Sequence, residues 1–260
     1  MQKRVKIMKN SNYTLGLVSV SFRNNSPREI VEAVKKSNLE VIEWGSDIHA
    51  PCNDINKLNE IVALQNEYGI KCSSYGTYFR LGVTPIDELE AYINAAKILG
   101  TDTLRMWCSN ENGADMVKYK RDVLIAHCRM AAKLAEKHNV TLCLECHQKT
   151  FTERYEDAVW LMNEIDSPNF RMYWQPFQWQ TVSENIAGAR KLAPYTEHLH
   201  VFNWRFSEKL QLIDGIDDWR AYLRELTAPR TLLLEFMPNG SIDELPIEAD
   251  ALRRIIEVDR

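Results

Sequence analysis

The chain alternates short apolar runs with longer amphipathic stretches, and the alternation repeats about eight times. The apolar runs have the length of buried β-strands, and each is followed by a stretch with apolar residues at helical spacing. The predicted strands are residues 14–22, 41–44, 72–75, 103–107, 141–146, 171–174, 198–202 and 232–236. They recur roughly every thirty residues, which is the length of one strand–helix unit, so the pattern predicts a parallel sheet covered by helices.

Several predicted helices carry clear start and stop signals. Ser26, Pro27 and Glu29 provide an N-cap, a proline at the first helical position and the acidic residue of a capping box. A second helix opens near Thr84, and Gly100 stands where it should end. Further helices are expected at residues 118–138, 153–164, 183–192, 217–226 and 242–257, with a weaker pattern at 55–68. The chain therefore consists of repeated units, with no linker rich in glycine and serine between them.

Length and the number of units together indicate the fold class. With 260 residues, 45% of them hydrophobic, the chain has the size of one (β/α)8 barrel and enough apolar side chains for its core. An open, doubly wound sheet would give a similar alternation. Polar residues at the ends of the predicted strands favour the closed form. We therefore expect an α/β fold, a single-domain (β/α)8 TIM barrel over residues 1–260.

Charge and cysteine content narrow the range of partners and locations. The formal net charge is −4 and no long run of Lys and Arg occurs, which argues against nucleic acid as a partner. The basic start, residues 2–9, is not followed by an apolar stretch suited to a signal peptide, and no run could span a bilayer. Cys143 and Cys146 fall on opposite faces of a predicted strand, so the six cysteines are expected to be free. We expect a cytoplasmic protein without membrane contact.

Two acidic residues stand out at the carboxyl ends of the predicted strands, where barrels place their functional groups. Glu145 and Glu235 each follow apolar strand residues, and a lone charge is costly to bury there. His200 has a similar place in its strand, and Gln175 could add an amide oxygen. Two carboxylates and an imidazole are a common ligand set for divalent cations. The charge of the two glutamates would balance one such ion.

The same residues have simpler interpretations. Glu145 or Glu235 could instead form a salt bridge with Arg105 or Lys149. His147 shares the strand face of Glu145 and could support it or contact a substrate.

Five tryptophans lie near predicted strand ends: Trp44, Trp107, Trp174, Trp179 and Trp204. Each alone is typical of core or rim packing. Their shared placement at the predicted mouth of the barrel favours a sugar-binding surface, because flat aromatic rings pack on the apolar faces of sugars while nearby polar groups bind the hydroxyls.

At these strand ends the sequence resembles the sugar phosphate isomerase/epimerase family, the xylose isomerase-like TIM barrels, and the resemblance covers nearly the whole chain. Its carriers are Glu145 in Leu-Glu-Cys-His, Gln175 in Tyr-Trp-Gln-Pro, His200 in His-Leu-His-Val-Phe-Asn-Trp and Glu235 in Leu-Leu-Glu. In ketose 3-epimerases of this family a Glu, an Asp, a His and a Glu bind one ion in that order. The resemblance implies that these four residues hold one divalent metal ion: Mn²⁺, Zn²⁺, Co²⁺ or Mg²⁺.

The sequence departs from the family pattern in two places. Gln175 stands where the family has an aspartate, and Gln178 stands where a histidine follows three residues later. An amide oxygen can bind a metal, but it is uncharged and its side chain is longer. We therefore expect a lower metal affinity or an altered substrate.

The resemblance implies a metal-dependent isomerase or epimerase of a sugar or sugar derivative. The reaction would begin with proton abstraction next to a metal-bound carbonyl, and Glu145 and Glu235 would be the catalytic residues. The substrate would be a small sugar or polyol, with or without a phosphate. The residues expected to position it are Trp44, His49, Arg105, Trp107, His147, Gln178, Asn203, Trp204 and Arg205.

Other functions fit the same pattern. A keto-polyol dehydratase, of the type that acts on inososes, would begin with the same proton abstraction. A sugar-binding barrel without catalysis is a second alternative, in which Gln175 marks a decayed site. A DNA-repair endonuclease of the same superfamily is disfavoured, because the extra His and Asp ligands of its three-metal cluster are missing. Barrels of this family often associate, which leaves a homo-oligomer open.

Overall fold

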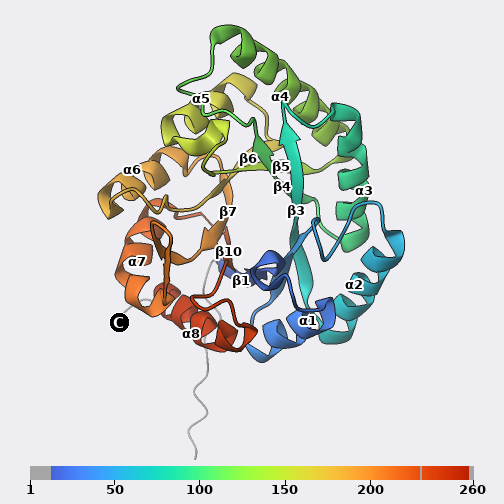
Figure 1. Cartoon of the computed structure of the whole chain (residues 1–260), viewed down its shortest axis with the longest axis vertical. Helices are drawn as coiled ribbons and strands as arrows, with labels where there is room; N and C mark the ends of the chain where they lie inside the picture. The colour runs from blue at the N-terminus through green and yellow to red at the C-terminus, as the bar shows by residue number, and fades with distance from the viewer. Residues whose placement is uncertain (1–12, 229, 258–260) are drawn as a thin grey trace, which may run out of the picture.

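The computed structural model describes residues 13–228 and 230–257. Eight parallel strands close into a barrel in the order β1-β10-β7-β6-β5-β4-β3-β2, and helices surround it (Figure 1). The predicted single-domain (β/α)8 barrel is confirmed. The basic start at residues 2–9 lies outside the described residues. Among the described helices, none combines the length and the apolar composition that a bilayer crossing requires.

The barrel strands and the helices alternate along the chain. The strands are β1 Tyr13–Val18, β2 Val41–Gly45, β3 Lys71–Leu81, β4 Thr103–Cys108, β5 Thr141–Glu145, β6 Phe170–Trp174, β7 Thr196–Val201 and β10 Arg230–Leu234. The helices are α1 Pro27–Lys36, α2 Ile55–Tyr68, α3 Leu89–Leu99, α4 Lys118–His138, α5 Tyr155–Ile165, α6 Val182–Leu192, α7 Ile216–Glu225 and α8 Leu245–Ile256. A two-stranded hairpin, β8 Asn203–Arg205 and β9 Glu208–Leu210, is inserted after β7.

The first and the third predicted strands differ most from the structure, at their carboxyl ends. The first ends at Val18, and Ser19–Phe22 form a 3-10 turn. Apolar and polar residues alternate through this turn as they do in a strand, which is why the sequence predicted a longer strand. In the structure Ser19 accepts a hydrogen bond from the backbone N–H of Gly45, and Ser21 accepts one from that of Phe236. The third strand, Lys71–Leu81, is longer than predicted. Its second half follows a register shift between Gly76 and Arg80, and the apolar residues there alternate too weakly to predict a strand.

Alternation along the strands divides the barrel into two apolar regions. One cluster contains Val41, Cys143, Tyr173 and Leu233, which come from strands on different sides of the barrel, so it fills the interior. The larger cluster lies between the strands and the helices, and Cys146 belongs to it. The prediction that Cys143 and Cys146 point to opposite faces is confirmed, and both are free thiols. The interior-facing positions also carry the polar groups of the site described next.

Candidate active site

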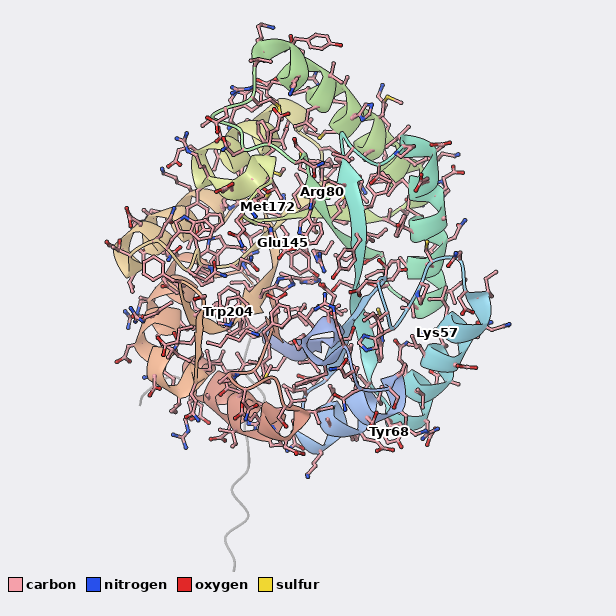
Figure 2. All side chains as sticks on the ribbon, viewed as in Figure 1. Lys57, Tyr68, Arg80, Glu145, Met172 and Trp204 are labelled. Atoms are coloured by element: carbon pink, nitrogen blue, oxygen red, sulfur yellow. The ribbon has the colours of Figure 1, made fainter. Side chains whose placement is uncertain are left out.

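Three buried side chains from separate strands converge inside the barrel. Glu145 ends β5, His200 lies in β7 and Glu235 directly follows β10. The ligand atoms that they offer all lie within 4.8 Å of one another. Nδ1 of His200 is 3.5 Å from Oε1 of Glu145 and 3.5 Å from Oε2 of Glu235. Figure 2 places Glu145 within the ring of strands, so residues far apart in the chain share one small space.

Gln175 brings an amide oxygen to the same point. It directly follows β6, and its Oε1 lies 3.0 Å from Nδ1 of His200. Its Nε2 donates a hydrogen bond to the carbonyl of Cys146 at 2.8 Å. Because that bond fixes the amide, the oxygen faces the other predicted ligands. The residues expected to bind a metal are therefore together and suitably oriented.

The spacing of these atoms fits a divalent ion. Metal–ligand bonds of about 2.0–2.2 Å at ordinary coordination angles put neighbouring ligand atoms about 3.0–3.5 Å apart. The distances from Nδ1 of His200 to the oxygens of Gln175, Glu145 and Glu235 are 3.0, 3.5 and 3.5 Å. Carboxylate, imidazole and amide donors suit the hard to borderline cations of the predicted set.

The two carboxylate oxygens of Glu145 have different partners. Oε2 accepts a hydrogen bond from the indole N–H of Trp107 at 2.6 Å and lies 3.1 Å from Nη1 of Arg105. Oε1 is the oxygen near His200. The ion pair with Arg105 and the metal-ligand role therefore involve different oxygens and are compatible. Hydrogen bonds of this kind orient metal ligands.

Arg105 does not reach the substrate space for which the sequence proposed it. The side chain is 3% exposed, and its Nε donates to Oε1 of Glu43 at 3.1 Å. With Nη1 beside Glu145, the guanidinium lies between two carboxylates beneath the predicted metal ligands. Because Arg105 on β4 faces the interior together with Glu43 and Glu145, it pairs with these carboxylates and does not line the cavity at the mouth of the barrel, contrary to the expected substrate contact.

Two other proposed substrate residues are also placed away from the site. Trp44 has no exposed surface, and its indole N–H donates to Gln65 of α2, so it packs between the barrel and the helices. The cause is alternation, since Glu43 points inward and its neighbour must point outward. His49 is buried, and its ring nitrogens lie 3.1 Å from Oγ of Ser19 and 3.2 Å from the carbonyl of Asn25. Neither side chain is available to a substrate in this structure.

A small cavity opens above the converging groups. Its volume is about 90 Å³, and it is lined by residues of the loops that follow β5, β6, β7 and β10. Among the residues proposed for substrate binding, His147, Gln178 and Trp204 line it. Trp107 packs beside His147, with ring centroids 5.2 Å apart. Lining residues that the sequence reasoning did not select include Phe177 and Phe236.

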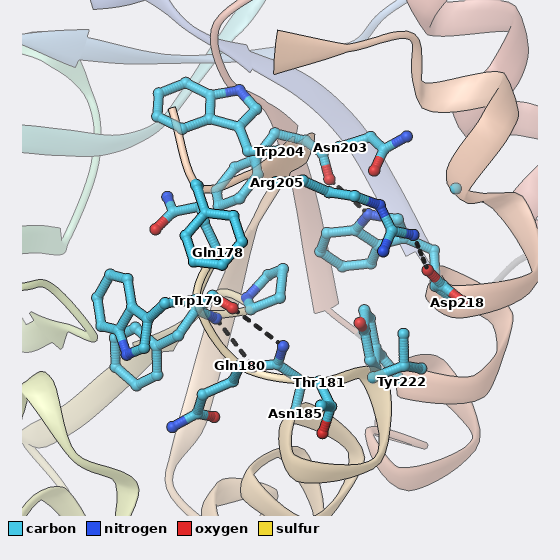
Figure 3. A pocket seen from close by; sticks show the side chains of 17 residues that line it. Gln178, Trp179, Gln180, Thr181, Asn185, Asn203, Trp204, Arg205, Asp218 and Tyr222 are labelled. Atoms are coloured by element: carbon cyan, nitrogen blue, oxygen red, sulfur yellow. Dashed lines mark hydrogen bonds and ion pairs between the residues drawn. The ribbon is translucent and has the colours of Figure 1, made fainter. Parts of the chain in front are cut away.

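A second, outer cavity of about 240 Å³ lies beside the first. It is bounded by the loop after β6, the hairpin and α7, and it shares Gln178 and Trp204 with the small cavity (Figure 3). Asn203 and Arg205 line this outer cavity only. Arg205 points toward Asp218, with Nη2 3.5 Å from its carboxylate, as Figure 3 shows. These two proposed residues therefore do not reach the converging glutamates.

Burial and neighbouring charges shift the pKa values of the titratable side chains inside the barrel when no cation is bound. Burial raises the pKa of Glu235, although His200 opposes this. Burial acts in the same direction on Glu145 and Glu43, but Arg105 and His200 outweigh it, so the pKa of Glu145 falls below its usual range and that of Glu43 falls to about 2. Burial lowers the pKa of an imidazole, yet the surrounding glutamates, Glu235 foremost, raise the pKa of His200 to about 10.

Glu43 lies at the end of the second predicted strand, in a Glu-Trp-Gly segment that also looks like the family, but no role in the site was predicted for it. It is fully buried and lies 3.6 Å from His200, with its Oε2 facing Nε2 of the ring. A signal was present in the sequence, because Glu43 follows Val41 and Ile42 in the same way that Glu145 and Glu235 follow apolar strand residues. A carboxylate in that context requires a partner.

Comparison with known proteins agrees with this architecture. A 3-dehydroshikimate dehydratase from Bacillus anthracis is 23% identical over 214 residues, covering 76% of this chain and 74% of that protein. The crystal structure of the probable 3-DHS dehydratase AsbF from Bacillus anthracis superposes with a TM-score of 0.79 at 18% identity, covering 92% of this chain and 98% of that one.

Two further structures share the fold. D-psicose 3-epimerase from Clostridium cellulolyticum H10, solved with D-tagatose, has a TM-score of 0.67 at 15% identity and covers 94% of this chain and 100% of its own. The IOLI protein with a bound zinc atom has a TM-score of 0.75 at 14% identity and covers 94% and 98%. The sequence model of the xylose isomerase-like TIM barrel family matches residues 31–255, and the chain belongs to that family.

Proposed function

We propose that the chain is a metal-dependent dehydratase of a small keto-polyol, in which Glu235 removes the proton beside the carbonyl. The observation that carries the proposal is the convergence of Glu145, His200 and Glu235 within 4.8 Å, at the base of a cavity open at the mouth of the barrel. A divalent ion held by Glu145, Gln175, His200 and Glu235 would supply a Lewis acid that polarises the substrate carbonyl.

The two glutamates differ in their freedom to exchange a proton. Oε2 of Glu145 accepts a hydrogen bond from Trp107 and forms an ion pair with Arg105, and both contacts stabilise the ionised form of Glu145. Among the described residues, Glu235 has only His200 within ion-pair distance, and burial raises its pKa. Glu235 is therefore the better proton acceptor, because no arginine or indole of the described residues holds its carboxylate in the way that Arg105 and Trp107 hold that of Glu145.

This asymmetry favours dehydration over the epimerisation that the sequence first suggested. An epimerase of the expected type needs a second group to return the proton from the opposite face, and Glu145 is held as a carboxylate. A dehydratase needs one base. Glu235 takes the proton, the C–H electron pair becomes a C=C bond, and the C–O bond at the next carbon breaks. Glu235 then returns the proton to the departing hydroxide, so the products are an unsaturated ketone and water.

The side chains around the small cavity suit such a substrate. His147 and Gln178 offer polar groups to hydroxyls, and Trp204 offers an aromatic face. The relative from Bacillus anthracis is named a 3-dehydroshikimate dehydratase, which supports the same reaction class. The D-psicose 3-epimerase has the same fold, which keeps a ketose in the set of test substrates.

The proposal is tested by NMR in D₂O. The protein is loaded with Mn²⁺, Co²⁺, Zn²⁺ or Mg²⁺ and incubated with 3-dehydroshikimate, an inosose or a ketose. Zn²⁺ and Mg²⁺, which are diamagnetic, are used where a paramagnetic ion would broaden the spectra. We expect water loss from a keto-polyol, with an absorbing unsaturated ketone as product. Inversion at the carbon beside the carbonyl without water loss would restore the epimerase. If no metal-loaded sample either exchanges this proton or forms product, the proposed chemistry is refuted.

A further inference from the structure

A fully buried ion pair lies in the barrel interior beneath the predicted metal ligands. Glu43 on β2 has no exposed surface. Its Oε1 accepts a hydrogen bond from Nε of Arg105 at 3.1 Å, and its Oε2 accepts one from the hydroxyl of Ser74 at 3.0 Å. Burying two charges is costly unless their geometry is specific, so a feature of this kind requires an explanation beyond the packing of the core.

The backbone is adapted to this pair. Gly76 on β3 lies beside it, and a Cβ atom there would be 2.6 Å from Oε1 of Glu43 and 2.9 Å from Nη2 of Arg105. Any larger residue would collide with both charged groups. The absence of a side chain at Gly76 leaves the space that the pair occupies.

Each member of the pair reaches one predicted metal ligand. Nη1 of Arg105 is 3.1 Å from Oε2 of Glu145, which leaves Oε1 of that glutamate for the cation. Oε2 of Glu43 is 3.6 Å from Nε2 of His200, a buried nitrogen without a hydrogen-bond partner among the described residues. A proton on Nε2 faces the Glu43 carboxylate, and Nδ1 then presents its lone pair to the ion. Groups that contact ligands in this way fix their orientation and tautomer.

The pair also sets the charge of the site. Arg105 and Glu43 neutralise each other, so Glu145 and Glu235 contribute two negative charges that match one divalent cation. Gln175 adds no charge. Loss of the Glu43 carboxylate would leave the guanidinium beneath the cation with Glu145 as its one ion-pair partner among the described residues.

We propose that Glu43 and Arg105, here called the supporting pair, are positioning residues that set the orientation of Glu145 and His200 and thereby the affinity for a divalent cation. The proposal rests on the metal centre of the proposed function and does not depend on which reaction follows. Neither residue lines the small cavity.

The test is Mn²⁺ binding to the full-length protein, measured by calorimetry and by the electron paramagnetic resonance spectrum of the bound ion. Glu43→Gln keeps the size of the side chain and removes its charge. We expect about 10- to 100-fold weaker Mn²⁺ binding and an altered spectrum. The matched control is Glu248→Gln, because Glu248 is also a buried carboxylate but accepts a hydrogen bond from the backbone N–H of Leu212 at 3.0 Å. We expect the control to bind Mn²⁺ like the unsubstituted protein.

If Glu43→Gln does not fold, the double substitution Glu43→Leu with Arg105→Met removes both charges together and leaves neither unpaired. The same weakening is expected, because Glu145 loses its fixed orientation. Mn²⁺ binding and a spectrum equal to those of the unsubstituted protein in the folded variant would overturn the supporting role and leave the proposed function intact. An unsubstituted protein that binds no divalent ion overturns both proposals. Weakened binding without any turnover supports the pair and counts against the proposed reaction.

Discussion

The proton on His200 makes metal binding depend on pH, and the structure gives the magnitude. Glutamates around the buried ring raise the pKa of His200 to about 10. A cation at Nδ1 must displace that proton. Below pH about 10, each unit decrease in pH should therefore weaken metal binding about tenfold, or about 1.4 kcal/mol. Between pH 8.5 and 6.5 the expected loss is about a hundredfold.

The stability of the metal-free protein should change in the opposite direction. The folded-state pKa of His200 lies above its unfolded value, so its contribution to stability is complete below pH about 6.5 and is lost as pH rises toward 10. The difference in melting temperature between metal-loaded and metal-free protein should consequently widen as pH rises.

Isothermal titration with Mn²⁺ at pH 6.5, 7.5 and 8.5 measures the effect. Repeating each titration in two buffers with different ionisation enthalpies counts the protons released, and we expect about one per ion. An affinity that changes less than about threefold across this range, with no proton release, would show that the cation does not displace a proton from His200.

Four single substitutions test the roles of other residues. Glu235→Gln should abolish deuterium exchange beside the substrate carbonyl in NMR while circular dichroism stays native, whereas full activity would exclude Glu235 as the base. Glu145→Gln should weaken metal binding, measured by calorimetry, and turnover, measured in the activity assay, to a similar extent. Loss of turnover with unchanged metal affinity would contradict the role of Glu145 as a metal ligand. Trp107→Phe removes the indole hydrogen bond to Glu145 and should reduce the free energy of unfolding by about 1–3 kcal/mol in urea titrations. An unchanged urea midpoint would mean that this bond contributes nothing. Gly76→Ala places a methyl group against the supporting pair and should destabilise the protein by about 1–3 kcal/mol, and a melting temperature equal to that of the native sequence would contradict the packing argument.

The sequence was most informative where periodicity and burial act together. The predicted helix at residues 118–138 coincides with α4, because its apolar residues are regular over several turns. The weaker pattern at residues 55–68 coincides with α2, which ends at Gly69 in a left-handed conformation. Glu145 and Glu235 were found because a charge in an apolar strand is costly and must have a partner. The convergence of these glutamates with His200 then follows from barrel closure, since neighbouring strand ends meet at one mouth.

The sequence could not show which partner each charged group finds. Arg105 was proposed as a substrate residue, yet its inward position in β4 directs it to Glu43 and Glu145, and only the closed barrel brings these groups together. His49 illustrates the same limit, because both its ring nitrogens face groups of nearby loop segments. The hairpin after β7 shapes the outer cavity, and its short strands give no periodic signal.

Both proposals require that Glu145, Gln175, His200 and Glu235 hold one divalent ion. Anomalous diffraction from crystals grown with Mn²⁺ or Co²⁺ tests it directly. We expect one strong peak at the mouth of the barrel, about 2.0–2.3 Å from Nδ1 of His200 and from an oxygen of each of the other three residues. No peak at this point, or a peak only at surface carboxylates while the four side chains remain bonded to one another, would contradict it.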